Sequence, residues 1–155
     1  MAAACKITPP WLLDVVTKKQ VGNVRDDVLK KLTHLNLEER NIQKIENLEV
    51  CEHLRVLYLF DNWIPRIENL NFAKDLTHLY LQNNRIAKIE SMDSLLRLEK
   101  LYLDGNEIIC IEGLAGLPRL QELSLSRQRP QITTAQFMDG AKGTTYHLPR
   151  SLPPQ

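Results

Sequence analysis

The sequence predicts an α/β solenoid in which about five units of 22 residues stack side by side, with a parallel sheet on the concave side and 3₁₀ or short helical turns on the convex side. Two observations predict this fold: a leucine recurs every 22 residues, and each copy opens the same phrase, L-x-x-L-x-L. A third is the series of apolar residues at a spacing of three that follows each phrase. Repeats with periods of 20 to 50 residues are typical of solenoids, in which a unit buries its apolar side chains only against its neighbours.

Each L-x-x-L-x-L phrase predicts a short strand, because side chains at a spacing of two point to the same face of a strand. Stacked units place parallel strands about 4.8 Å apart and join their leucines into one core. The five phrases are Leu32/Leu35/Leu37, Leu54/Leu57/Leu59, Leu76/Leu79/Leu81, Leu98/Leu101/Leu103 and Leu120/Leu123/Leu125.

An asparagine follows the strand in the three central units, at Asn62, Asn84 and Asn106, while Arg40 and Gln128 take its place in the first and fifth. The chain leaves the strand here, and a side-chain amide can bond backbone groups that the turn would otherwise bury unpaired. We therefore predict a structural asparagine ladder in which losing one partner costs roughly 1–3 kcal/mol.

The second half of each unit has apolar residues at every third position, which predicts 3₁₀ or helical turns with one side facing the core. We expect these side chains to extend the core along the convex side. They are Ile45, Ile67, Ile89 and Ile111, then Leu48, Leu70, Met92 and Leu114, and finally Cys51, Ala73, Leu95 and Leu117.

The two ends of the chain differ from the middle. Thr8 before two prolines signals a helix start, and Asn23 can cap a second short helix, so we expect residues 1–31 to form a helical N-terminal cap over the first repeat. Residues 32–129 form the repeat domain. Residues 130–155 hold four of the eight prolines and no periodic apolar pattern, which predicts a flexible C-terminal tail and a poorly protected outer edge of the fifth strand unless the tail folds back.

One column of residues between the strand leucines faces outward on the concave sheet and carries three tyrosines. Adjacent tyrosines supply rigid amphipathic surface of the kind enriched at protein-binding hot spots, although such a ladder can also serve only to stabilise the sheet. Phe60 and Val56 extend the apolar patch, which favours binding. The column is Asn36, Tyr58, Tyr80, Tyr102 and Ser124.

The concave face is mildly acidic, with six acidic residues against three basic ones, a balance of −3 in a chain of net charge +1. This favours a partner with a basic patch and disfavours nucleic acid. His34 and His78 on this face are interpreted as surface groups rather than ligands. The charged residues counted are Glu38, Glu39, Asp61, Glu99, Asp104 and Glu122, against Arg55, Lys100 and Arg127.

A second column, of glutamates, is interpreted as structural rather than catalytic. Each glutamate follows an anchoring isoleucine, and a basic residue precedes three of them by two positions, so two ladders of opposite charge can offset one another. The residues are Glu46, Glu68, Glu90 and Glu112, with Lys44, Arg66 and Lys88.

No chemistry-bearing motif occurs in the 155 residues: there is no Gly-rich phosphate loop, no nucleophile beside a general base and no metal-ligand cluster. We therefore predict no enzyme, no catalytic residue, no cofactor and no metal. Cysteines at 5, 51 and 110 form no CxxC pair and suit reduced thiols inside a cell. No segment approaches the roughly 18 apolar residues of a membrane span, so we expect a cytoplasmic protein that does not contact a membrane. We also expect a monomer that binds no nucleic acid.

Three phrases carry a family resemblance: Lys44–Leu48 (KIENL), Arg66–Leu70 (RIENL) and Leu79–Ile86 (LYLQNNRI). They resemble the 22-residue leucine-rich repeats of the regulatory subunits of protein phosphatase 1, over about residues 24 to 129. Within that family, Leu76–Asn84 and Leu98–Leu117 are most similar to the testis leucine-rich-repeat regulatory subunits. Such relatives usually continue with further repeats and a C-terminal cap, whereas the pattern here stops near residue 129.

The resemblance implies a non-catalytic regulatory subunit that grips the phosphatase catalytic subunit through acidic and aromatic residues of its concave face. The positions that match are Tyr58, Phe60, Asp61, Tyr80, Tyr102 and Asp104. The repeats also resemble those of centrosomal and axonemal scaffolds that associate with dynein or tubulin, which is the alternative function. The cytoskeleton, centrosome, cilium and nucleus are accordingly alternative locations to the general cytoplasm. A spliceosomal adaptor similar to the A-prime protein of the U2 particle is a weaker third interpretation.

Overall fold

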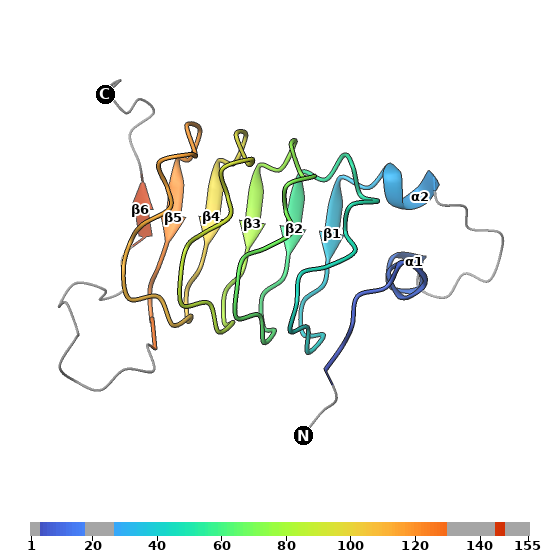
Figure 1. The fold of residues 1–155 in the computed structure, drawn as a ribbon, viewed down its shortest axis with the longest axis horizontal. Helices are drawn as coiled ribbons and strands as arrows, with labels where there is room; N and C mark the ends of the chain where they lie inside the picture. Colours follow the sequence, from blue (N-terminus) through green and yellow to red (C-terminus); the bar gives the residue numbers. More distant parts are fainter. Residues whose placement is uncertain (1–3, 18–26, 130–144, 148–155) are drawn as a thin grey trace.

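The computed structural model describes residues 4–17, 27–129 and 145–147, which coil into a solenoid with its strands side by side in chain order (Figure 1). Two helices at one end are α1 (Pro9–Thr17) and α2 (Asp27–Lys30). Six strands of the described chain form a single sheet in the order β1 to β6. They are β1 (His34–Asn36), β2 (Val56–Tyr58), β3 (His78–Tyr80), β4 (Lys100–Tyr102), β5 (Glu122–Ser124) and β6 (Thr145–His147).

The first five strands are parallel, and their register follows the 22-residue period without a slip. Leu35 pairs with Leu57, and that pairing continues through Leu79 and Leu101 to Leu123. Parallel neighbours need a return connection, and the second half of each repeat supplies it along the convex side. The predicted solenoid with a parallel concave sheet is confirmed.

The convex connections turn inward at every third residue, as the apolar spacing predicts. They consist of single turns rather than the 3₁₀ or helical segments that we expected. In the second repeat, Ala73 N bonds Leu70 O at 3.0 Å and Leu76 N bonds Ala73 O at 3.1 Å. A 3₁₀ helix needs such bonds at consecutive residues, whereas here only the inward-facing residues donate them.

In the second, third and fourth repeats, two positions adopt the left-handed backbone conformation. The first lies in the turn after the strand and has φ of 55° at Asp61, and the second begins the convex side with φ of 57° at Asn69. Because this region penalises a Cβ, glycine and asparagine suit it best. Gly105 and Gly113 occupy these same two positions in the fourth repeat.

The N-terminal helices cover the open face of the first repeat. Thr8 Oγ1 accepts the backbone N–H of Trp11 at 3.4 Å, as expected of a helix N-cap. Leu12 of α1 and Leu29 of α2 are fully buried in the same core as the repeat leucines. The predicted capping by Asn23 lies outside the described residues.

The C-terminal edge differs from expectation at three residues. We predicted a flexible tail from residue 130, but Thr145–His147 forms β6, which pairs antiparallel with β5. The parallel array leaves the outer backbone groups of β5 unpaired, and pairing with β6 satisfies them. The other predicted tail residues, 130–144 and 148–155, lie outside the described part of the chain.

The apolar core also ends earlier than predicted on the convex side. Ile111 was expected to be buried with its counterparts, but 57% of its surface is exposed, against 1% for Ile89 one repeat before. Leu114 is likewise only partly buried. In this solenoid each convex isoleucine is covered by the turn of the following repeat, and no described segment supplies that turn beyond Ile111.

Candidate protein-binding surface

The tyrosine column predicted from the repeat forms a continuous ring stack across the concave sheet. Tyr58 pairs with Tyr80, and Tyr80 with Tyr102, in the register of β2, β3 and β4. The ring centroids are 4.7 Å and 4.8 Å apart, with interplanar angles of 15° and 4°. This spacing equals the distance between adjacent strands, so the sheet itself imposes the stacking. The three side chains are half-buried.

Phe60 adds a fourth aromatic ring two residues after Tyr58 on the same face. Its ring lies edge-on to Tyr58, at 6.4 Å and 85°, and is also half-buried. Val56 is nearly buried beside them. The centre of the concave face is therefore apolar over β2 and aromatic across β2, β3 and β4.

Tyr102, at the β4 end of the stack, is held by a hydrogen bond within the protein. Tyr102 donates its hydroxyl to Glu122, and Lys100 Nζ lies 3.1 Å from Glu122 Oε2. Burial, together with the hydrogen bond to Glu122, raises the pKa of Tyr102 well above its ordinary value. In contrast, no side-chain hydrogen bond holds the hydroxyls of Tyr58 and Tyr80 within the described chain.

Asp104, predicted as a partner contact, has an internal role in the structure. It is 7% exposed, and its Oδ1 accepts Ser124 Oγ at 2.7 Å, Ser126 N at 2.9 Å and also Ser126 Oγ. Burial alone would raise the pKa of Asp104, but the hydrogen bonds from Ser126 and Ser124 lower it below the ordinary value. Asp104 therefore anchors the fifth repeat to the fourth.

Asp61, the other predicted acidic contact, is exposed in the turn that follows Phe60. Its Oδ1 accepts the side-chain N–H of Asn83 at 2.7 Å. In the turn after β1, Glu38 and Glu39 add two carboxylates, and neither has a side-chain partner in the described chain. The acidic character of the concave face is thus concentrated beside β1 and β2.

Two polar side chains in and just after β3, His78 and Gln82, are partly buried. Burial, and then the charge of Lys100, lower the pKa of His78 below its ordinary value. Gln82, beside Phe60 in the neighbouring repeat, has its Oε1 buried without a hydrogen-bond partner in the described chain.

The three asparagines at the strand ends make the contacts that a structural ladder requires. Asn84 Oδ1 accepts the backbone N–H of Ile64 at 3.0 Å, and Asn84 Nδ2 donates to Leu59 O at 2.9 Å and to Leu81 O at 3.0 Å. Asn62 and Asn106 make the equivalent bonds in their own repeats. Each amide joins its own turn to that of the preceding repeat.

A second asparagine ladder was not predicted. Asn47 Nδ2 donates to Ile7 O, and Asn69 Nδ2 donates to Ile45 O, both at 2.7 Å. The phrase I-E-N-L, shared by two repeats, was the available signal. Trp63 was also missed: its half-buried ring is covered by the guanidinium of Arg85 at 5.3 Å.

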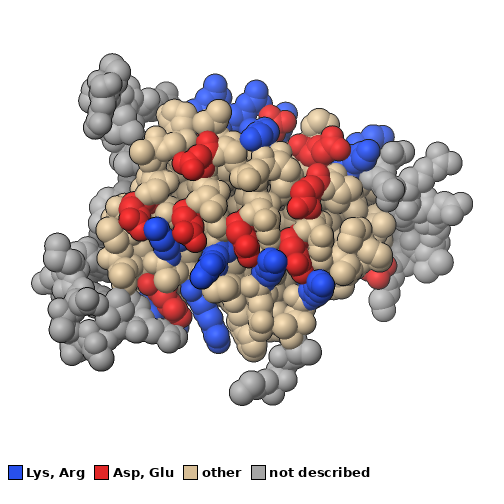
Figure 2. Space-filling model, in the orientation of Figure 1, with Lys and Arg blue, Asp and Glu red and all other residues tan. Residues whose placement is uncertain are grey.

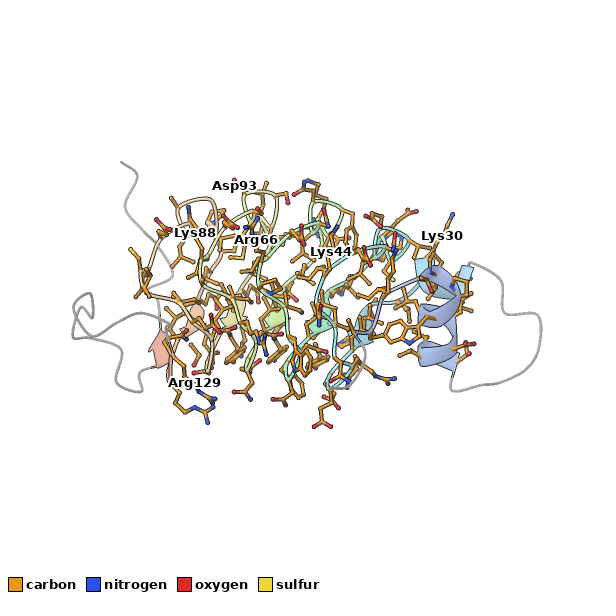
Figure 3. All side chains as sticks on the ribbon, turned by 60° about the horizontal axis from the view of Figure 1, so that its bottom comes forward. Lys30, Lys44, Arg66, Lys88, Asp93 and Arg129 are labelled. Carbon is orange, nitrogen blue, oxygen red and sulfur yellow. The ribbon has the colours of Figure 1, made fainter. Side chains whose placement is uncertain are left out.

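The glutamate column lies among basic residues. Figure 2 shows acidic and basic side chains in neighbouring rows across one face of the solenoid, and Figure 3 shows Lys44, Arg66 and Lys88 following one another along it. Lys44 Nζ lies 4.0 Å from Glu46, and Lys88 Nζ lies 3.6 Å from Glu112 in the next repeat. These exposed pairs explain the column as a solvated surface of mixed charge.

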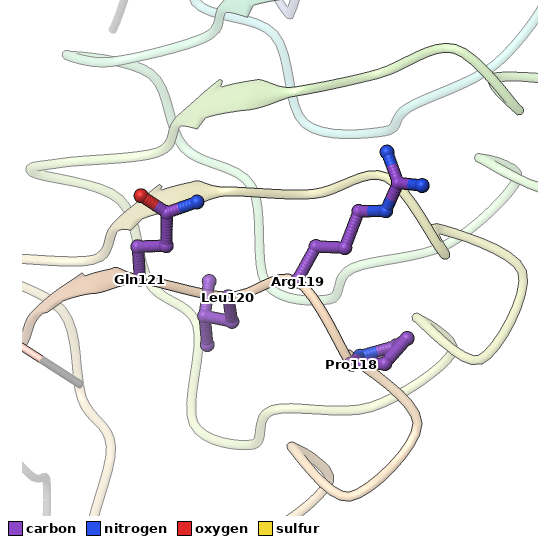
Figure 4. Close-up of a pocket in the computed structure, with 4 residues that line it drawn as sticks. All are labelled: Pro118, Arg119, Leu120 and Gln121. Carbon is purple, nitrogen blue, oxygen red and sulfur yellow. The ribbon is translucent and has the colours of Figure 1, made fainter. Parts of the chain in front are cut away.

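A small pocket lies near the last repeat, between Pro118 and Gln121 (Figure 4). Its described lining contains one charged side chain, Arg119, beside Leu120, and so lacks an acid–base pair. Among the residues that the structure describes, no group of three or more His, Cys, Asp or Glu side chains could hold a metal ion. None of the described helices is long and apolar enough to cross a membrane.

Comparison with known proteins supports the repeat assignment. Residues 52–95 match the family described as Leucine Rich repeats (2 copies), and residues 74–129 match the family described as Leucine rich repeat. This chain is a leucine-rich-repeat solenoid. Solenoids of this class are typically binding scaffolds rather than enzymes, and they present an extended concave surface to their ligands.

Similar solved structures contain the same solenoid. An internalin (InlF) of Listeria monocytogenes is 28% identical with a TM-score of 0.65, covering 75% of this chain and 36% of that one. Internalin C2 of the same organism is 30% identical with a TM-score of 0.61, covering 68% and 47%. TLR13 in the TLR13–ssRNA13 complex is 33% identical with a TM-score of 0.58, covering 63% and 15%. This leucine-rich-repeat chain thus spans less than half the length of each.

Proposed function

We propose that this leucine-rich-repeat solenoid is a non-catalytic module that binds a protein partner through its concave face. The observation that carries the proposal is the half-buried stack of Tyr58, Tyr80 and Tyr102 at the centre of that face. Tyrosine offers large, rigid contact area with a polar tip, and it is enriched at interface hot spots. Two of these hydroxyls remain available to a partner.

The charge of the same face supports a protein with a basic patch. Glu38, Glu39 and Asp61 cluster beside the aromatic centre, whereas a nucleic acid would need a continuous basic surface. Although a structural neighbour occurs in a complex with single-stranded RNA, the concave acidic residues here would repel phosphates.

We further propose that the partner is the catalytic subunit of protein phosphatase 1, for which this chain would act as a regulatory subunit. The support is the resemblance of Lys44–Leu48, Arg66–Leu70 and Leu79–Ile86 to the repeats of such subunits. Its contacts would be made by Tyr58, Phe60, Asp61 and Tyr80. Tyr102 and Asp104 would contribute mainly by holding the stack and the fifth repeat in place.

The test is a binding titration of purified phosphatase catalytic subunit against this chain at low and high salt, with circular dichroism to verify folding. We expect binding that weakens with salt, because the acidic concave residues contribute to association. The double variant Tyr58→Ala/Tyr80→Ala should weaken it at least tenfold. The matched control is Lys44→Ala/Arg66→Ala on the mixed-charge surface, which should leave the affinity unchanged.

The outcomes distinguish a phosphatase regulatory subunit from a centrosomal or axonemal scaffold, the two functions that the sequence suggests. Equal affinity of the folded tyrosine variant and the wild type would show that the concave stack is not the binding surface. Absence of phosphatase binding by the folded wild type, together with co-sedimentation with microtubules, would favour the centrosomal or axonemal scaffold.

A further inference from the structure

The two ends of the tyrosine stack differ in how they are closed. Beyond Tyr102, the next position of the column is Ser124, which is 5% exposed and donates to Asp104. Glu122 holds the Tyr102 hydroxyl and is itself paired with Lys100. At this end, the charges and hydrogen-bonding groups are matched within the protein.

At the other end, the stack stops at Tyr58. The next position of the column, opposite Tyr58 in the β1–β2 register, is Asn36, whose side chain is exposed. The sheet spaces the tyrosine rings by 4.7–4.8 Å, so the shorter asparagine leaves room for one more planar group against the outer face of Tyr58. Phe60 borders this space from the side, with its ring edge-on to Tyr58.

A carboxylate flanks the same space. Glu38 lies two residues after Asn36, on the same face, and the backbone bond from Glu39 N to Phe60 O at 3.3 Å continues the strand pairing beside it. The Glu38 side chain is half-buried, yet no partner for its carboxylate occurs in the described chain. At the position of the fourth repeat that is equivalent to Glu38, the carboxylate of Asp104 accepts three hydrogen bonds. Glu38 thus lacks the matching donor that its counterpart has.

We propose that the outer face of Tyr58 and the carboxylate of Glu38 bind an arginine side chain of the protein partner. This proposal rests on the concave face being the binding surface. A guanidinium is planar, stacks on an aromatic face and donates two parallel hydrogen bonds to a carboxylate. It would extend the stack by one layer in the place that Asn36 leaves open. An ammonium group lacks the planar fork and fits this space less well.

The site can be tested without the partner, by amide NMR of the chain titrated with a capped peptide of three arginines separated by glycine. The reference peptide carries citrulline, which keeps the shape and removes the charge. We expect saturable shifts confined to residues 34–39 and 58–61, with at least fivefold weaker binding of the citrulline peptide. Glu38→Gln and Asn36→Tyr should each abolish these shifts, the latter by filling the space with a fourth tyrosine.

Tyr102→Phe is the matched control, because it alters the closed end of the stack and should leave the shifts intact. Shifts centred on the glutamates of the mixed-charge surface, or shifts that persist in Asn36→Tyr, would overturn the proposal. Glu38→Gln and Asn36→Tyr replace a half-buried and an exposed side chain of the concave face. Circular dichroism verifies that the variants fold.

Phosphatase binding then distinguishes this proposal from the proposed function. Local peptide shifts without any phosphatase binding would remove the phosphatase as partner and leave the arginine site standing. Phosphatase binding that is equal in the wild type, Glu38→Gln and Asn36→Tyr would remove the arginine site and leave the concave-face function standing. If both proposals hold, the two variants weaken phosphatase binding at least tenfold.

Discussion

The side-chain amide of Gln128 accepts the backbone N–H of Ile108 at 2.9 Å, the bond that an asparagine accepts in the three repeats before it. Gln128 Nε2 also donates to Leu103 O at 2.8 Å, as Asn106 Nδ2 donates to Leu81 O. One extra methylene is therefore compatible with the ladder. The fifth repeat, which lacks a described convex half, is still joined to the fourth through this amide.

The asparagine ladder predicts a large loss of stability on substitution at its centre. Asn84→Ala would leave the N–H of Ile64 without its acceptor in a buried turn. It would also remove one of the two amide donors of the Leu59 and Leu81 carbonyls, which keep their bonds from Asn62 and Asn106. We expect the free energy of unfolding to fall by roughly 1–3 kcal/mol in urea titrations, which is the cost of one buried unpaired group.

The control for that experiment is Asn71→Ala. Asn71 is exposed and accepts one bond, from Ser94 at 3.3 Å. A change within about 0.5 kcal/mol is expected there. Similar losses for the two asparagines would contradict the ladder's structural role.

Gly113 lies at a backbone position that has no room for a Cβ atom. It has φ of 72°, and a Cβ placed on it would lie 2.1 Å from Ile89 O, a backbone atom that cannot move aside. Gly105 has a similar φ of 69°, but its Cβ would meet the flexible side chain of Asn83. Both alanine variants carry the left-handed strain of roughly 1–2 kcal/mol, and only Gly113→Ala adds the clash.

We therefore expect Gly113→Ala to lower the midpoint of thermal unfolding by several degrees more than Gly105→Ala does. Differential scanning calorimetry of the two variants measures this difference directly. A larger decrease of the midpoint in Gly105→Ala would contradict this expectation. It would show that the Asn83 side chain cannot rotate away from the new Cβ, whereas the backbone at Ile89 can shift to accommodate one.

Particular residues show how far the sequence predicts this structure. Leu35, Leu57 and Tyr80 fall where the 22-residue period places them, because a repeated phrase imposes the same strand and the same face on each unit. Asp104 was assigned to a partner because its acceptance of Ser124 and Ser126 depends on the next repeat folding against it. Strand β6 carries no repeat, and its pairing depends on the exposed edge of β5 rather than on any pattern in its own three residues.

The exposure of Ile111 also depends on the repeat that follows it and could not be predicted from its own repeat. Its position in the repeat is that of Ile89, so the pattern predicts burial for both. Whether the side chain is covered depends on the following repeat, which the local sequence does not encode. The I-E-N-L phrase was noted for its glutamate and isoleucine, while the role of its asparagine depends on a left-handed turn that only the folded backbone reveals.

Asp104 predicts a pH-dependent contribution to stability. The hydrogen bonds from Ser126 and Ser124 hold the pKa of Asp104 below its ordinary value of 3.8, so protonation is harder in the folded state than in the unfolded state. Such a group stabilises the fold above its unfolded pKa, and the stabilisation is lost as pH falls through the folded pKa. Asp104→Asn should therefore destabilise the chain by about 1–2 kcal/mol at pH 7.

The measurement is urea unfolding of the wild type and Asp104→Asn at pH 7 and pH 3. The stability gap between them should narrow at pH 3. The exposed Asp93 provides the control, since Asp93→Asn should give a gap close to zero at both pH values. A gap for Asp104 that stays constant with pH would show that its hydrogen bonds do not depend on ionisation.

Ile89 and Ile111 offer a matched pair one repeat apart that locates the end of the core. Ile89→Ala removes a side chain that is 1% exposed and should cost about 2–5 kcal/mol through lost burial and the cavity left behind. Ile111→Ala removes one that is 57% exposed and should cost less than about 1 kcal/mol. Urea titration of both variants measures the difference. Equal losses would mean that Ile111 is covered in solution, and the core would then extend one turn beyond the fourth repeat.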